Sequence, residues 1–252
     1  MHPRLSSGNF FIDTEYRILH EDEDLIVVDK PAPLAVHPVG AYKELNLQSL
    51  MLKDPRFAGV QIKTVHRLDA ETSGVLIIAK NHEAARFLGG EFEAGRVRKK
   101  YEAIVFGCPA QLGGDILDPL GYDASSGFQT VRVRDTEAGE SAHTRYEVIR
   151  AGADYAHVRL TPLTGRTHQL RVHLALLGHP IVGDKIYVDL DLFERYVSGG
   201  LDEAILGRLK LPRLALHASE ITFTHPRSRE TRTFFCALPE LLQAFLTEQG
   251  LS

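Results

Sequence analysis

The sequence predicts a mixed α+β fold, built on a largely antiparallel sheet with flanking helices. Three observations lead to this fold class: the chain holds many short apolar runs rich in β-branched residues, few helical patterns and several hairpin signals. Its 252 residues and 44% hydrophobic content are enough for a substantial core. Repeats at solenoid spacing and blocks of like charge are absent from the sequence, which argues against repeat and disordered architectures.

Residues 1–14 are expected to form a polar extension, followed by a single domain over residues 15–252. The N-terminal stretch lacks the apolar run of a signal peptide, and no later segment approaches the roughly 20 apolar residues of a membrane span. We therefore expect a cytoplasmic protein without membrane association. Cys108 and Cys236 lie far apart without neighbouring ligands at metal-like spacing, so we expect two reduced, structural thiols.

Apolar runs and alternation predict the strands. The first run is stopped by Pro31 and Pro33, and residues 99–107 alternate in a way that predicts burial on both sides of the strand. A turn at Gly152 separates two strands that form a hairpin, and a turn at Pro226 separates the last two. The expected strands are 25–28, 74–80, 99–107, 144–149, 155–161, 214–226 and 231–238.

Three helices are expected from capping and stop signals. Asn81 is a predicted N-cap for the first, and the third covers residues 238–250, with Pro239 near its start. The second begins after Gly165 and ends at Gly178, since a proline follows two residues later. Residues 189–213 are the best candidate for an insertion.

The charge balance argues against promiscuous binding of polyanions. The chain has 29 Lys and Arg against 33 Asp and Glu, a net charge of −4 and a pI near 6.3. A local basic groove is still compatible with these values. Its candidate segments are 96–100, the helix around Arg166 and Arg171, 208–213 and 225–232.

Asp69 lies in the stretch VHRLDAETSGVLIIAK, where polar residues precede a buried strand. A carboxylate at this position can stay ionised beside a cation such as Arg67, and an ionised, partly desolvated carboxylate is a competent nucleophile. A turn cap or a surface ion pair with Arg67 would explain the same residue without chemistry.

A second cluster lies in LTGRTHQLRVHLALLGHPIVGD, which spans residues 163–184. Arg166, His168, Arg171 and His173 line the expected helix start. Arg166 would face the positive end of the helix dipole, so its position indicates an anionic partner.

Together these segments make the chain resemble the RluA family of RNA pseudouridine synthases. VHRLDAETSGVLIIAK, KKYEAIVFG, LTGRTHQLRVHLALLGHPIVGD and LHASEITFTHP occur in the family's order, with a weaker match in EDEDLIVVDKPAPLAVHP. The resemblance covers residues 16–246. It implies the pseudouridine synthase fold with a central catalytic cleft, isomerisation of specific uridines in ribosomal or transfer RNA, and no metal or organic cofactor. Pro33 stands where the family commonly has Gly.

The resemblance also implies roles for individual residues. Asp69 matches the essential aspartate, which acts on a uridine turned out of the RNA stack. Tyr101 matches the tyrosine that lies against the uracil, and Arg166 matches the basic partner of the aspartate. Arg67 looks like the residue that fills the gap left by the flipped base. RNA or substrate binding is predicted for His66, Arg67, Lys99, Lys100, His168, Gln169 and Arg171.

Other expectations concern the whole chain and the alternatives. The resemblance begins by residue 16, so we expect no separate N-terminal RNA-binding domain, and we expect a monomer. A metal-dependent hydrolase could use His66, Asp69, His168 and His173, although their spacing fits no compact metal motif. A glycosylase or nucleoside hydrolase could use the same aspartate, and a non-catalytic RNA-binding module would not need it.

Overall fold

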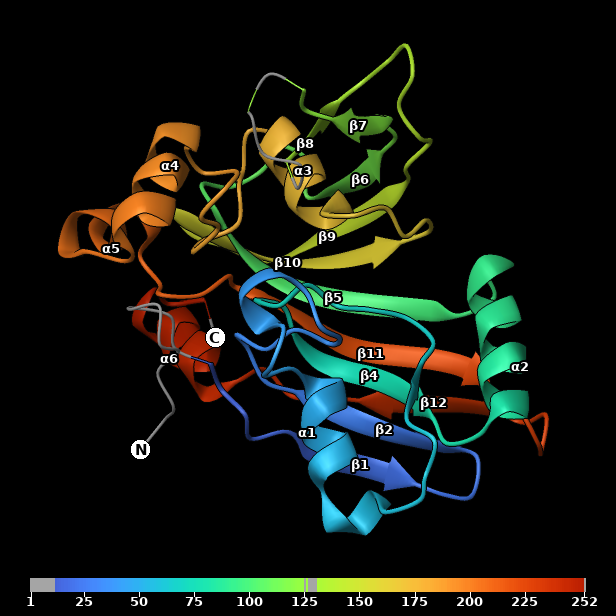
Figure 1. Ribbon diagram of the computed structural model, residues 1–252. Helices are drawn as coiled ribbons and strands as arrows, with labels where there is room; N and C mark the ends of the chain where they lie inside the picture. The colour runs from blue at the N-terminus through green and yellow to red at the C-terminus, as the bar shows by residue number, and fades with distance from the viewer. Residues whose placement is uncertain (1–11, 125, 127–130, 252) are drawn as a thin grey trace. The chain divides into compact units, whose positions relative to one another are not determined.

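The structure is a computed structural model that describes residues 12–124, 126 and 131–251 (Figure 1). Two compact units interleave along the chain. The first contains the described residues up to Lys99 together with His217–Leu238, and the second contains Lys100–Leu216 and the described residues from Pro239. Ile12 is fully buried and the N–H of Asp13 donates to the carbonyl of Pro33, so the chain packs onto the first unit from residue 12. Residues 1–11 of the predicted extension lie outside the described residues.

The sheet of the first unit is organised around β4 (Ser73–Ala79), in which all seven residues are buried. On one side β4 pairs antiparallel with β2 (Leu25–Lys30), and β2 pairs with β1 (Arg17–Glu21). The start of β4 pairs in parallel with β11 (Leu216–Thr224) and its end pairs with β3 (Lys63–Thr64). β12 (Thr231–Phe235) pairs antiparallel with β11.

Two α-helices are present in the described part of the first unit. The predicted cap of α2 (His82–Glu93) is confirmed, because the Asn81 side chain accepts the N–H of Ala84. This helix packs against β3 and β4. α1 (Leu47–Lys53) was not predicted from the sequence and starts with a capping box between Asn46 and Ser49. Short 3-10 turns at Gly40–Tyr42 and Pro55–Phe57 flank α1.

The second unit has an antiparallel sheet in the order β5-β10-β9-β6. The hairpin predicted around Gly152 is confirmed. Its strands, β9 and β10, pair antiparallel, and in the turn the N–H of Gly152 donates to the carbonyl of Tyr155. A separate two-stranded sheet joins β7 and β8. The strands are β5 (Arg98–Phe106), β6 (Gly113–Ile116), β7 (Leu120–Tyr122), β8 (Arg132–Arg134), β9 (Thr144–Ala151) and β10 (Tyr155–Pro162).

The predicted start of the second helix after Gly165 is wrong. α3 (Gln169–Leu176) begins three residues after Arg166, because His168 adopts a left-handed backbone with φ of 57° and cannot continue the helix. Arg166 therefore lies in the turn before α3. All six residues from Gln169 to Leu174 are buried, so α3 is covered on more than one side.

The remaining helices complete the second unit. The segment predicted as an insertion forms α4 (Leu190–Gly199) and α5 (Glu203–Leu209), which share a small hydrophobic cluster. In α6 (Glu240–Glu248), the ring of Phe245 packs edge-on against Tyr155 at 5.2 Å between centroids. Cys108 and Cys236 are free thiols. Among the described residues, no helix has the length and apolar character needed to cross a membrane.

Candidate active site

Asp69 lies in the loop that leads into β4, as the sequence predicts. The residue is partly exposed, and its carbonyl accepts the N–H of Thr72 to close a turn. Leu68 before it and Thr72 after it are buried, so both sides of the turn are anchored in the first unit. The carboxylate thus belongs to a short loop whose ends are fixed by the core.

The side chain of Lys30 binds the backbone of this loop. Its side chain is fully buried, and Nζ donates to the carbonyls of Pro31, Leu34 and Ala70 at 2.9, 2.7 and 3.3 Å. Three carbonyl acceptors match the three donors of an ammonium group. A second bond joins the same segments, since the N–H of Leu34 donates to the carbonyl of Ala70. No role for Lys30 was predicted from the sequence. Its position at the end of an apolar run is the feature of the sequence that points to its burial.

Gly74 fixes the point where the Asp69 loop becomes a strand. Its φ is +114°, and a Cβ at this position would lie 2.2 Å from the carbonyl oxygen of Ala218 in β11. Only glycine permits both this backbone and this approach. Next to it, Ser73 Oγ lies 2.9 Å from His217 Nδ1, and both side chains are buried. The strand behind the loop is therefore held by β11 as well as by β2.

The other predicted residues of the first unit have different surroundings. His66 Nε2 accepts the N–H of Ile77 at 2.9 Å, and its ring stacks on Phe92. Burial, and then the charge of Lys99, lower the pKa of His66 to about 3, so the imidazole is neutral at pH 7. Arg67 is exposed, and burial lowers the pKa of the Lys99 ammonium.

Tyr101 and Lys100 lie on β5 in the second unit. Tyr101 is 9% exposed and is paired in register with Leu160 of β10. Lys100, on the opposite face of the strand, is exposed. The strand thus presents the two side chains in opposite directions.

Arg166 is bound within the second unit by acceptors close to β7. Its Nη1 donates to Glu140 Oε2 at 2.6 Å, and its Nε donates to the carbonyl of Ser141 at 3.0 Å. Both side chains of the ion pair are more than a third exposed, so the pair contributes little stability. The expected pairing of Arg166 with Asp69 joins residues of different units and stays a prediction.

Gln169 organises the turn that carries Arg166. Its Oε1 accepts Thr164 Oγ1 at 2.7 Å and the N–H of Arg166 at 3.0 Å. Its Nε2 donates to the carbonyl of His143 and to Thr144 Oγ1. All four bonds are made by a side chain that is 4% exposed, which assigns it a structural task. The predicted role of Gln169 in binding RNA stays a prediction.

Arg171 forms a buried ion pair. Its Nε and Nη2 donate to the two carboxylate oxygens of Asp184 at 2.7 and 2.8 Å. Burial raises the pKa of Asp184, but the charge and hydrogen bonds of Arg171 outweigh it and hold the pKa below its usual value. Asp184 Oδ1 also accepts the N–H groups of Ile186 and Tyr187. The RNA-binding role predicted for Arg171 stays a prediction, while its guanidinium has a buried partner.

The histidines of the hydrolase alternative are engaged in hydrogen bonds. His173 is fully buried, and its two ring nitrogens lie 2.9 Å from Thr144 Oγ1 and 3.0 Å from the carbonyl of Asp118. His168 Nδ1 lies 2.9 Å from the hydroxyl of Tyr187. Together with the acceptor role of His66, these contacts argue against these histidines as metal ligands.

The comparison with known families decides the identity of the fold. The model of the RNA pseudouridylate synthase family matches residues 24–176, which include Asp69, Tyr101 and Arg166. The chain belongs to this family. This match confirms the predicted resemblance, and the protein is an RNA pseudouridine synthase. The mixed, largely antiparallel sheet described above and the solved structures given below confirm the predicted fold class.

Relatives of the synthase extend this likeness over most of the chain. Ribosomal large subunit pseudouridine synthase D of Pseudomonas aeruginosa is 36% identical, over 90% of this chain and 70% of its own. The dual-specificity RNA pseudouridine synthase RluA of Escherichia coli is 38% identical, over 86% and 90%. Among solved structures, human RNA pseudouridylate synthase domain containing 4 has a TM-score of 0.73 and 29% identity and covers 92% of both chains.

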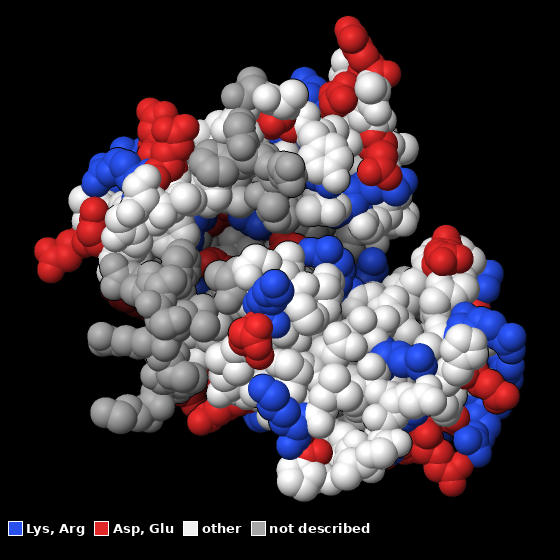
Figure 2. All heavy atoms as spheres, in the orientation of Figure 1, with Lys and Arg blue, Asp and Glu red and all other residues white. Residues whose placement is uncertain are grey.

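Charges of both signs are mixed on the surface of the synthase. On the face that Figure 2 shows, Lys and Arg side chains lie among Asp and Glu side chains. This mixture agrees with the net charge of −4.

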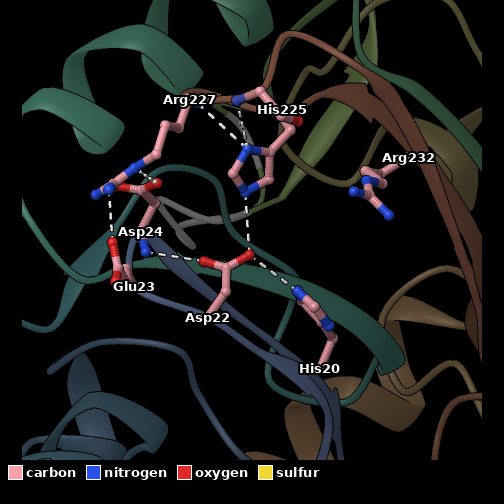
Figure 3. A pocket seen from close by; sticks show the side chains of 8 residues that line it. His20, Asp22, Glu23, Asp24, His225, Arg227 and Arg232 are labelled. Carbon is pink, nitrogen blue, oxygen red and sulfur yellow. Dashed lines mark hydrogen bonds and ion pairs between the residues drawn. The ribbon is translucent and has the colours of Figure 1, made fainter.

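A pocket of the first unit contains a cluster that the sequence did not predict (Figure 3). Asp22 Oδ2 lies 2.9 Å from His20 Nε2 and 3.0 Å from His225 Nε2. Arg227 donates to both carboxylate oxygens of Asp24. Within the described part of the chain, Asp22, Asp24 and His225 are the three residues that could approach one metal ion. Arg227 already binds both carboxylate oxygens of Asp24. The ion pairs of the cluster therefore join the β1–β2 turn to the β11–β12 turn.

The Asp22 cluster predicts a loss of stability in acid. Burial raises the pKa of Asp22, but hydrogen bonds from His20, from two backbone N–H groups and from His225 lower it to about 2, against 3.8 when unfolded. Because the native pKa is the lower one, the stabilisation is complete above about pH 4 and disappears as the pH falls towards 2. We expect Asp22→Asn to cost about 1 kcal/mol at pH 7, since partial exposure screens the pairs.

Urea unfolding of native protein and Asp22→Asn between pH 7 and pH 2 measures this effect. The two free energies of unfolding should converge as the pH falls from 4 to 2. Asp191→Asn, at an exposed position in the first turn of α4, serves as the control for removing one surface carboxylate. A constant difference between native protein and Asp22→Asn down to pH 2 would refute the assignment.

Proposed function

We propose that the synthase isomerises particular uridines of ribosomal or transfer RNA, with Asp69 as the nucleophile acting on a flipped-out uridine. The placement of Asp69 carries the proposal: a partly exposed carboxylate in a loop that buried Lys30 anchors directly before β4. The names of the relatives from Pseudomonas aeruginosa and Escherichia coli support ribosomal RNA and more than one class of RNA as targets. A cytoplasmic location and a monomeric state stay predictions.

The reaction determines what these residues have to do. The bond between ribose C1′ and N1 of uracil breaks, the base turns within the site, C5 bonds to C1′, and the proton on C5 is lost while N1 gains one. Asp69 can start this sequence by adding to C6, by attacking C1′ or by taking a proton from C2′. Each route needs an ionised carboxylate, and the proposed role of Arg166 is to keep it so.

Tyr101 and Arg67 are proposed to handle the flipped base. Turning a nucleotide out of a helix costs a few kcal/mol. The ring of Tyr101 would stack on the uracil, and exposed Arg67 would fill the vacated place in the RNA. Late in the reaction, the phenol oxygen of Tyr101 would take the proton from C5.

The test uses RNA that carries tritium at C5 of uridine. Unmodified transfer RNA and large-subunit ribosomal RNA are supplied as separate pools, without added metal. We expect the native protein to release tritium to water from at least one pool, which also identifies the target class. Release of free uracil would indicate the glycosylase alternative, and RNA binding without either product would indicate the non-catalytic module. Silence of the folded protein on both pools would contradict the proposal.

A further inference from the structure

The hydroxyl of Tyr187 lies where separate segments of the second unit meet. It accepts the N–H of Arg132 in β8 at 3.0 Å and lies 2.9 Å from His168 Nδ1. A phenol oxygen that accepts one hydrogen bond can take part in a second, here with the imidazole nitrogen. One oxygen thus ties a strand of the β7–β8 sheet to the residue that precedes α3.

The ring of Tyr187 is fixed by its packing. It lies against a buried cluster made by Leu120 of β7, Ala142 and Val172 of α3. The Arg171 guanidinium lies 5.1 Å from the ring centroid. The backbone is fixed as well, because the N–H of Tyr187 donates to buried Asp184. These contacts of the ring and the backbone fix the position of the Tyr187 hydroxyl.

The contact of Tyr187 with His168 reaches Arg166 through the backbone. His168 occupies the left-handed position that separates the turn from α3. Gln169 follows His168 in sequence, and its side-chain Oε1 accepts the N–H of Arg166. The turn between Arg166 and α3 is held at both ends, by Gln169 and by the pair of His168 and Tyr187.

We propose that Tyr187 is a positioning residue of the synthase: its hydroxyl holds the β7–β8 sheet and the turn before α3 in one arrangement and thereby places the Arg166 side chain. The inference rests on the function proposed above for Arg166. It does not make Tyr187 a catalytic residue, because the hydroxyl is already engaged by Arg132 and His168.

The variant Tyr187→Phe tests the link directly, since it keeps the ring and removes only the hydroxyl. Tyr146→Phe is the matched control, because it removes a hydroxyl that donates to the carbonyl of Gln111 elsewhere in the second unit. Amide exchange of Arg132, followed by NMR, should be faster in Tyr187→Phe and unchanged in Tyr146→Phe. An unchanged exchange rate in Tyr187→Phe would overturn the proposal, and this readout does not depend on enzymatic activity.

Single-turnover release of tritium from C5-labelled RNA tests the consequence for the reaction. Loss of about one hydrogen bond of positioning should slow Tyr187→Phe about tenfold. Tyr146→Phe should stay within about twofold of the native rate. A native-like rate for Tyr187→Phe would overturn the proposal, whereas an inactive native protein with the expected exchange pattern would instead refute the proposed function.

A double-mutant cycle with Arg166→Lys separates positioning from general support of the fold. Lysine keeps the charge but loses the planar donors of the guanidinium. If Tyr187 acts through Arg166, then Tyr187→Phe should slow Arg166→Lys by no more than about twofold. Full additivity of the two rate effects, or a fall in melting temperature that accounts for the rate loss, would overturn the proposal.

Discussion

Asp69→Asn is expected to lower tritium release from C5-labelled RNA by about four orders of magnitude or more, as removal of a nucleophile does in other enzymes. The amide has nearly the shape of the carboxylate but cannot form the covalent bond or accept the proton that the three routes require. RNA affinity should change by less than about fivefold, because the substitution at this partly exposed position keeps the size and shape of the side chain. The measurement is single-turnover release with saturating enzyme, together with RNA binding by filter retention.

Thermal melting provides the control for Asp69→Asn. The loop is held by backbone bonds of Ala70 and Thr72, which the substitution leaves in place. Asp69→Asn should therefore stay folded and melt cooperatively, as should Asp191→Asn, an exposed change in α4. Loss of the folded state would show that Asp69 is structural, and release within tenfold of the native rate would exclude it as the nucleophile.

Asp184→Asn should cost about 3 to 5 kcal/mol in the free energy of unfolding, because it leaves the buried Arg171 guanidinium without its counter-charge. The side chain of Asp184 is fully buried, so water cannot replace the lost partner. Its bonds to the N–H groups of Ile186 and Tyr187 survive, since the amide oxygen also accepts. Urea unfolding followed by circular dichroism at pH 7 measures the loss.

The double variant Arg171→Met with Asp184→Asn is the control for this ion pair. Methionine removes the buried charge and keeps an unbranched apolar chain of similar length. Replacing both charges is often neutral, so the double variant should be more stable than Asp184→Asn alone. If the loss of stability in the double variant equals the sum of the losses in Arg171→Met and in Asp184→Asn, the pair does not stabilise the fold in the way proposed.

Strong local patterns explain how much of the fold was predictable. Apolar runs and alternation predict β4 and the pair of β9 and β10. The N-cap residue Asn81 predicts the start of α2. β7 and β8 have three residues each, too few to produce a period. The start of α3 was misplaced because nothing in the local sequence marks the left-handed backbone of His168, whose ring contacts Tyr187 nineteen residues away.

The candidate site was predictable only in part for the same reason. The sequence places Asp69 in a loop before a buried strand, and the structure agrees. Lys30 and Gln169 were not predicted as supports, because lysine and glutamine are ordinarily exposed. Their burial depends on distant partners: the carbonyl of Ala70 lies forty residues from Lys30, and Thr144 lies twenty-five residues from Gln169.

The return of the chain to the first unit has a consequence for synthesis on the ribosome. Ser73 meets His217 only after a further 144 residues have been added, so the start of β4 keeps an open edge until β11 emerges. Meanwhile, the polypeptide between these strands supplies most of the other unit. Pairings so distant along a chain form slowly and leave apolar edges open to aggregation. We therefore expect the nascent chain to be most prone to aggregation while residues 100–216 are being translated.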